Sequence, residues 1–130
     1  MSSFRTVNAT IFASLLTASC GDTICSNKEV SRIGSGDGRV EAVVTERDCG
    51  ATTRVATRIH VVPKGRAASN DETVVLVADG VTGVKTQWSN SGILEIRYAT
   101  ARIFQFTNFW MSRELDNFQY VVRITEREGS

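Results

Sequence analysis

Apolar and polar side chains alternate along most of this chain, and this alternation limits the fold more than any other feature of the sequence. The segment over 53–62 is the clearest case, because Val55, Thr57, Ile59 and Val61 alternate with Arg54, Ala56, Arg58 and His60. A period of two residues is typical of a β-strand with one buried face and one exposed face. Pro63-Lys64-Gly65 follows, so we expect a strand that ends before this turn.

The same period returns in segments separated by turn-forming residues. In Arg39 to Arg47, the apolar Val40, Ala42 and Val44 share one face. The glycines and Asp37 over 34–38 tolerate tight turns, which predicts a hairpin with a strand over 29–33. A second hairpin is predicted around Asn90-Ser91-Gly92, which separates strands over 84–89 and 93–98. Further strands are expected over 102–106 and 118–125, with a turn or short helix over 108–117.

One segment has no alternation. Thr73 to Ala78 reads TVVLVA, a continuous apolar run between Asp71 and Asp79-Gly80. Such a run is typical of a strand that is covered on both faces. We therefore expect it to be the central strand of the fold.

About seven or eight strands follow from these patterns, together with no helix longer than two turns after residue 19. The sequence thus predicts an all-β fold, either an antiparallel sandwich or a strongly twisted sheet. Of the 130 residues, those over 20–130 have the size of a single domain.

The segment over 1–19 has a different character. Arg5 is the only charged residue before Asp22, and residues 9–19 carry no charge. A basic start, a short apolar stretch and small residues before a cut are typical of a secretory signal peptide. Leu16-Thr17-Ala18-Ser19-Cys20 resembles the bacterial lipobox, in which the cysteine receives lipid. We predict a signal helix over 1–19 and a protein anchored through Cys20 to a membrane of the cell envelope, facing the periplasm or the exterior. The alternative is an ordinary N-terminal helix packed on a soluble domain.

The cysteine count agrees with export. If Cys20 carries lipid, Cys25 and Cys49 remain as an even pair, and an oxidising compartment favours a disulfide between them. Two alternatives use the thiols differently. Cys20, Cys25, Cys49 and His60 would supply four zinc ligands, although structural zinc sites usually space their cysteines in close pairs. Cys49 would also serve as a nucleophile with His60 as its base. We expect neither a metal nor a cofactor.

The charge balance bears on partners. The chain has 15 Lys and Arg and 14 Asp and Glu, so without Arg5 the basic and acidic residues are equal in number. Nucleic-acid-binding domains carry a basic patch or stripe, and the arginines here are spread along the chain. We therefore expect no nucleic-acid partner.

Residues 25–53 contain Gly36-Asp37-Gly38, then E-A-V-V over 41–44 and E-R-D-C-G-A-T-T over 46–53, and L-E-I-R-Y follows at 94–98 after Trp88. These segments resemble a family of small, uncharacterised bacterial proteins, many with lipoprotein-type N-termini. The family's turn often reads Ser-Pro-Asp-Gly, whereas the turn over 34–38 here lacks the proline that would stiffen it. The resemblance implies a β fold, export and the pairing of Cys25 with Cys49. It implies no catalytic residue, because the family has no assigned function.

Two segments are candidate binding sites. In the first, Arg47, Asp48, Thr52 and Thr53 form a polar binding loop on a rigid scaffold. The competing interpretation is that Cys49 cross-links this corner while Asp48 and Thr52 satisfy backbone donors in the turn. The second is Phe109-Trp110-Met111, which falls in a break between strands. Most aromatic residues should be buried, but Phe109 and Trp110 would form a partner-binding patch if Trp110 is exposed.

Three functions remain open. The first is a lipid-anchored envelope protein with a binding or structural role, whose partner is a protein or an envelope component. The second is an inhibitor or immunity-type protein that occludes a partner. The third is a hydrolytic enzyme, for which Asp48, Thr52, His60 and Glu95 are the available acid and base groups. The enzyme ranks last because hydrolysis requires a nucleophile and a base within reach of each other.

Overall fold

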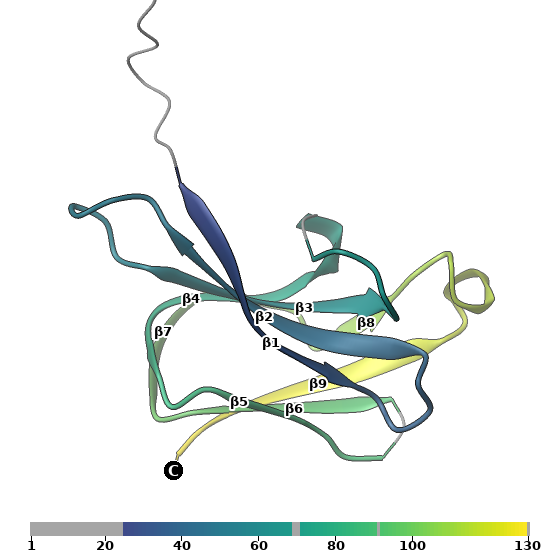
Figure 1. Cartoon of the computed structure of the whole chain (residues 1–130). Coiled ribbons are helices and arrows are strands. Elements are labelled where there is room, and N and C mark those ends of the chain that lie inside the picture. The colour runs from purple at the N-terminus through teal and green to yellow at the C-terminus, as the bar shows by residue number, and fades with distance from the viewer. Residues whose placement is uncertain (1–24, 69–70, 91, 130) are drawn as a thin grey trace, which may run out of the picture.

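The computed structural model describes residues 25–68, 71–90 and 92–129, which form two β-sheets packed face to face (Figure 1). The five-stranded sheet contains, in spatial order, β1 (Ser26–Gly34), β2 (Val40–Asp48), β3 (Ala56–Pro63), β4 (Val74–Thr82) and β7 (Thr100–Phe106). The four-stranded sheet contains β5 (Lys85–Trp88), β6 (Ile93–Tyr98), β9 (Val121–Glu128) and β8 (Phe109–Met111). Two short 3-10 helices complete the fold, η1 (Asp71–Thr73) and η2 (Asp116–Phe118). The predicted all-β sandwich is confirmed.

The N-terminal predictions concern other residues. The signal helix over 1–19 and the lipidation site Cys20 lie outside the residues that the structure describes. Among the described residues, no helix has the length and apolar character needed to cross a bilayer.

The described residues contain nine strands rather than seven or eight, and the additional strand is β8. Its three residues are too few to show a period of two, and a turn or short helix was the prediction for this segment. The short helix is present as η2, but Phe109–Met111 pairs with β9 instead. The chain changes sheets just before it. The Thr107 N–H donates to the carbonyl of Val75 in β4, while the Asn108 carbonyl accepts from the N–H of Ile124 in β9.

One pair of strands is parallel. Residues 93–98 of β6 run alongside residues 123–128 of β9 in the same direction. All the other strand pairs in the described part of the chain are antiparallel. The prediction of an antiparallel sandwich therefore needs this correction. Residue alternation is the same in parallel and antiparallel strands, so the sequence pattern contained no signal for the direction.

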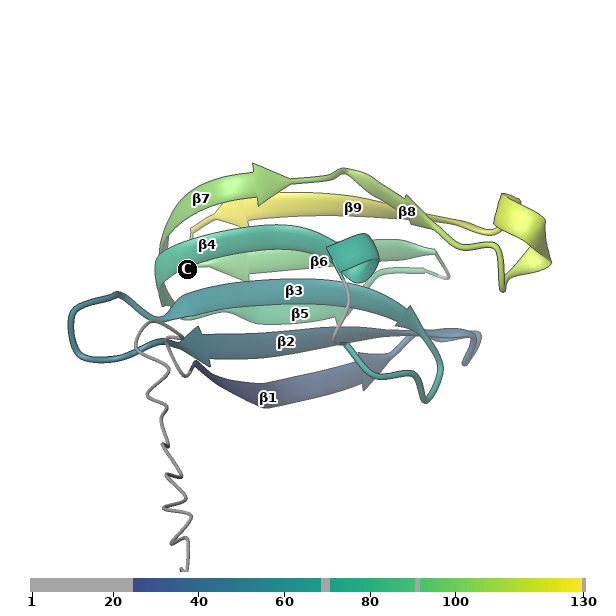
Figure 2. The same cartoon turned by 90° about the horizontal axis from the view of Figure 1, so that it is seen from above.

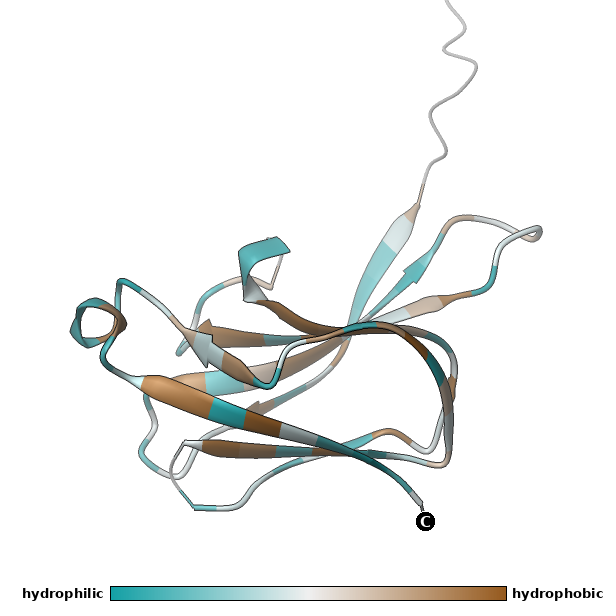
Figure 3. Ribbon diagram, turned by 180° about the vertical axis from the view of Figure 1, so that it is seen from behind, coloured by the Kyte–Doolittle hydropathy of each residue, from teal (hydrophilic) through white to brown (hydrophobic). Residues whose placement is uncertain are grey.

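The core lies between the two sheets and follows the predicted alternation. Val40, Ala42 and Val44 of β2 pack against inward-facing side chains of both sheets. The other buried members of this cluster are Ile59, Val61, Val75, Leu76, Ala78, Leu94, Ile96, Trp110, Val122 and Ile124. Both predicted hairpins are confirmed, since β1 pairs with β2 and β5 pairs with β6. Figure 3 shows the alternation as brown and teal bands along β9.

The apolar run in β4 is covered on both faces, as its composition predicts. Val74, Val75 and Leu76 are all buried, and Figure 3 shows the first half of β4 as continuously brown. Residues 64–68 return across the outer face of this sheet, and η1 lies in front of β3 and β4 in Figure 2. The central strand, however, is β3, and β4 is its neighbour.

Candidate functional site

A disulfide marks the end of the molecule where the described chain begins. Cys25 precedes β1 and Cys49 follows β2, and their sulfur atoms lie at disulfide distance. Ser26 and Asp48 are the neighbouring partners in the ladder. The first hairpin is therefore closed by a turn at one end and by this cross-link at the other. A disulfide leaves no thiolate on Cys49, so the alternative roles as nucleophile or zinc ligand do not apply to this oxidised form.

The corner after Cys49 is organised by its own side chains. The Asp48 carboxylate accepts a hydrogen bond from the Gly50 N–H at 3.0 Å. The Thr53 hydroxyl donates to the Gly50 carbonyl at 3.3 Å, and Thr52 is exposed. Asp48 and Thr53 thus serve the turn, which agrees with the structural interpretation for Asp48. Arg47 differs from its predicted companions, because its side chain lines a cavity.

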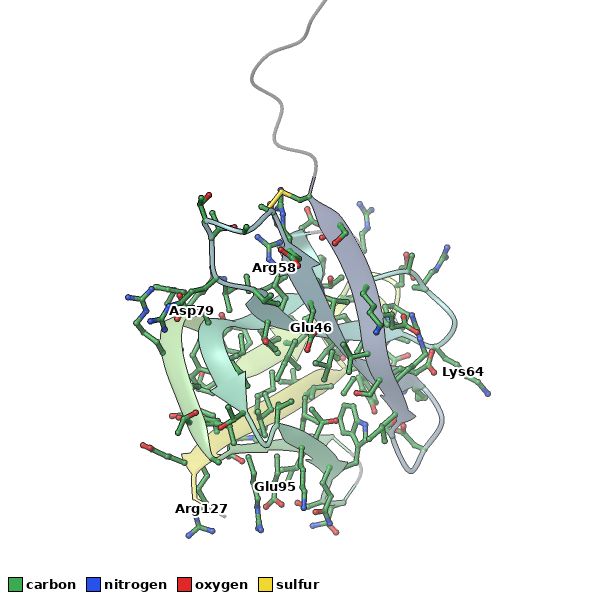
Figure 4. The ribbon with its side chains drawn as sticks, turned by 60° about the vertical axis from the view of Figure 1, so that its left-hand side comes forward. Glu46, Arg58, Lys64, Asp79, Glu95 and Arg127 are labelled. Atoms are coloured by element: carbon green, nitrogen blue, oxygen red, sulfur yellow. A yellow bond between two sulfur atoms is a disulfide. The ribbon has the colours of Figure 1, made fainter. Side chains whose placement is uncertain are left out.

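This cavity lies on the outer face of the five-stranded sheet and has a volume of about 240 Å³. We call it the outer-face cavity, and its lining residues are Asn27, Thr45, Arg47, Arg58, His60, Ala68 and Asp71. Three adjacent strands bring the polar residues together, since Asn27 pairs with Arg47 and Thr45 pairs with Arg58 in the ladders. Figure 4 shows Arg58 at the same end of the molecule as the disulfide.

His60 forms the floor of the outer-face cavity. Its side chain is buried, with only 2% of the residue exposed. The Nδ1 atom lies 2.9 Å from the hydroxyl oxygen of Thr73, and the Nε2 atom lies 3.3 Å from that of Thr45. Burial, together with the nearby Arg58 cation, lowers the pKa of His60 to about 4, although Asp71 acts in the opposite direction. The imidazole is therefore neutral at pH 7.

Arg58 is the central cation of the site. One terminal nitrogen forms an ion pair with Asp71 at 3.2 Å. The Nε atom is buried and has no hydrogen-bond acceptor among the described residues. A buried donor without an acceptor costs roughly 1–3 kcal/mol. The alternation in the sequence predicts that Arg58 and His60 share one face of β3, but it does not connect them with Asn27 and Thr45. That connection requires the register of three strands, which alternation alone does not supply.

The residues considered as the acid and base groups of an enzyme do not lie together. His60 contacts two threonine hydroxyls on the outer face of the five-stranded sheet. Asp48 lies at the corner after β2, and Glu95 lies on β6 in the other sheet. Figure 4 shows Glu95 and Arg58 at opposite ends of the molecule. In the described parts of the chain, no three His, Cys, Asp or Glu side chains are grouped so that they could hold a metal ion.

The condition for the predicted aromatic patch, an exposed Trp110, is not met. Trp110 is only 5% exposed and packs in the core, whereas Phe109 is 47% exposed. The two differ because β8 is a strand, so neighbouring side chains point to opposite faces. Phe109 belongs to a series of exposed apolar side chains along β7, β8, η2 and β9. We call this series the apolar edge, and its members are Phe104, Phe106, Phe109, Met111, Phe118 and Val121.

Comparisons with protein-family models, with curated proteins and with solved structures find no match to this chain.

Proposed function

We propose that this protein is an exported module, tethered to the cell envelope through Cys20, and that it binds a ligand in the outer-face cavity rather than catalysing a reaction. The observation that carries the binding role is the convergence of polar side chains from β1, β2 and β3 on one cavity. Side chains on paired strands are held more rigidly than side chains on loops, and a rigid scaffold suits recognition.

The disulfide supports export from the cytosol. Disulfides form and persist in oxidising compartments and are rare in the cytosol. The Cys25–Cys49 pair lies at disulfide distance, so export accounts for two of the three cysteines in the sequence. Lipidation of Cys20 would account for the third.

The contacts of His60 support binding over catalysis. A general base must reach the proton that it removes. Both ring nitrogens of His60 already lie beside threonine hydroxyls, and the side chain is buried. The imidazole is thus arranged to orient Thr45 and Thr73 rather than to act on a substrate.

The experiment for the tether is the intact mass of the protein recovered from its native membrane fraction, with and without reduction. We expect a diacylglyceryl adduct on Cys20 and a mass increase of about 2 Da on reduction of one disulfide. A Cys20→Ala variant should leave the membrane fraction. An unprocessed chain that starts at Met1 and has three free thiols would contradict the proposal.

The apolar edge favours a second candidate, an inhibitor or immunity-type protein that occludes a partner. Exposed apolar side chains mark protein interaction sites where they form a contiguous patch. Here they follow the chain from β7, at the margin of one sheet, to β8, at the margin of the other (Figure 2). Cross-linking in intact envelopes separates the two candidates. Loss of a specific cross-linked partner in Phe109→Ser, but not in Arg47→Gln, would favour occlusion.

A further inference from the structure

We propose that the outer-face cavity binds a tetrahedral oxyanion, namely a phosphate group, held by Arg47 and Arg58. This inference rests on the proposed binding function and names the ligand class for the same site.

The lining of the cavity is rich in hydrogen-bond donors. Arg47 is exposed and has no ion-pair partner among the described residues. Arg58 contributes the buried Nε donor that lacks an acceptor. Asn27 and Thr45 add an amide and a hydroxyl beside the two guanidinium groups. An anion with several acceptor oxygens satisfies such a set, and guanidinium groups bind phosphate through paired hydrogen bonds.

The charges in and around the cavity favour an anion. His60 is neutral at pH 7, so the lining carries two cations and one carboxylate. That carboxylate belongs to Asp71, whose side chain is 94% exposed and pairs with Arg58 from one side. Glu29 is the carboxylate aligned with Thr45 on β1, and it is neutralised by Arg32 at 2.7 Å. Among the residues that the structure describes, no carboxylate pairs with the guanidinium of Arg47.

The size of the cavity limits the ligand. Sites for drug-sized molecules are usually about 300–1,000 Å³, and this cavity measures about 240 Å³. It suits a single small group rather than a whole sugar or nucleotide. The phosphate can arrive as a free ion or as part of a larger molecule, such as a lipid headgroup, whose remainder stays outside the cavity.

Calorimetric titration of the full-length protein tests the proposal. The titrants are sodium phosphate, sodium acetate as a planar carboxylate, and sodium chloride at equal ionic strength. Vesicles of phosphatidylcholine with and without phosphatidylglycerol form a second arm. The test variants are Arg47→Gln and Arg58→Gln, and the matched control is Arg97→Gln on the four-stranded sheet, which loses the same charge.

We expect saturable binding of phosphate at one site, weakened about tenfold or more in each test variant and less than twofold in the control. Arg47 is exposed and forms no ion pair within the described part of the chain, so its variant should fold normally even if Arg58→Gln does not. Binding of free phosphate would identify a soluble ligand, whereas binding only to phosphatidylglycerol vesicles with loss in Arg47→Gln would identify a headgroup. Both results support the proposal.

Three results would overturn it. These are no saturable binding in either arm, acetate binding as tightly as phosphate, and equal weakening in Arg97→Gln. The third would show that general electrostatic attraction is responsible. The mass measurement on Cys20 does not depend on any of these outcomes, so the oxyanion site can fail while the tethered binding module stands.

Discussion

The outer faces of the two sheets are built in different ways. On the five-stranded sheet, residues 64–68 and η1 lie over the outer face (Figure 2), and Val43, His60 and Val62 beneath them are each at most 2% exposed. On the four-stranded sheet, the outward side chains of β6 and β9 are mostly charged, and Arg97, Arg123 and Arg127 are exposed. One outer face is a second buried layer, and the other lies open.

The two outer faces also differ in how their polar side chains are paired. Under the cover, His60 has specific partners in two threonine hydroxyls, whereas the buried Nε of Arg58 has no acceptor among the described residues. On the open face, Lys85, Arg97 and Arg127 are aligned across β5, β6 and β9. Like charges opposite each other in a sheet are destabilising. Glu95 offsets part of this repulsion by pairing with Arg97 at 3.9 Å, and the rest depends on screening by water and salt.

Removing the disulfide should give the largest effect and should act on the five-stranded sheet first. In a Cys25→Ser/Cys49→Ser variant, we expect the free energy of unfolding to fall by about 3 kcal/mol, since the cross-link no longer constrains the unfolded chain. β1 is a largely exposed edge strand, so its amides should lose hydrogen-exchange protection before those of β6. Denaturant unfolding and hydrogen exchange measure the two effects. Equal loss of protection in β1 and β6 would contradict the assignment of the cross-link to one sheet.

Acidification should give the second-largest effect, and it should act through the outer face of the five-stranded sheet, where His60 lies. His60 is the only histidine in the chain. Its ordinary pKa is 6.5, and burial lowers the pKa to about 4 in the folded protein. The unfolded chain thus takes up a proton below pH 6.5 while the folded protein does not. The contribution of neutral, buried His60 to stability is fully present above pH 6.5 and is lost as the pH falls toward 4. We expect the free energy of unfolding to decrease by about 2 kcal/mol between pH 7 and pH 5.

The control for this prediction is His60→Gln, which should make stability nearly constant between pH 5 and pH 7. Interactions with their neighbours lower the pKa values of Glu29, Asp37, Glu41 and Asp79 in the folded protein from the ordinary 3.8 to 4.5. The stability that these four carboxylates contribute is therefore lost mainly below pH 5, outside this range. Thermal unfolding across the pH series provides the measurement. An equal slope in the parent and the variant would show that His60 is not the titrating group.

These faces also show what the sequence could predict. Alternation in Arg39 to Arg47 and in 93–98 located the strands, and the run TVVLVA indicated a strand with two covered faces. The direction of β9 and the presence of β8 could not be predicted, since both depend on which strands meet in space. The outer-face cavity could not be predicted from the sequence for the same reason. Among the lining residues, the sequence alone marks only Arg47 and His60 as candidates. Their neighbours on β1 and β3 follow from the register of the strands.

A matched pair of valines tests the cover directly. Val43 is fully buried on the outer side of β2, whereas Val121 is 45% exposed on the outer side of β9. Truncation of Val43 to alanine removes two buried methyl groups, so we expect a loss of about 1.5 kcal/mol. Val121→Ala should change stability by less than about 0.5 kcal/mol. Comparable losses would mean that the open face is covered in solution, for example by a second molecule.

The smallest predicted effect has opposite signs on the two faces. Arg127→Gln removes one cation from the row with Lys85 and Arg97, so we expect stability to rise by a few tenths of a kcal/mol. Arg32→Gln on the five-stranded sheet removes contacts to Glu29 at 2.7 Å and Glu41 at 3.0 Å, so stability should fall by about 0.5 kcal/mol.

Both differences between these arginine variants and the parent should shrink at high salt, where exposed charges are screened. Denaturant unfolding at low and high ionic strength provides the measurement. A loss of stability in Arg127→Gln would mean that this arginine has an anionic partner on the open face. The charges of the open face would then be paired as Arg32 is on the five-stranded sheet, and the two faces would differ only in their cover.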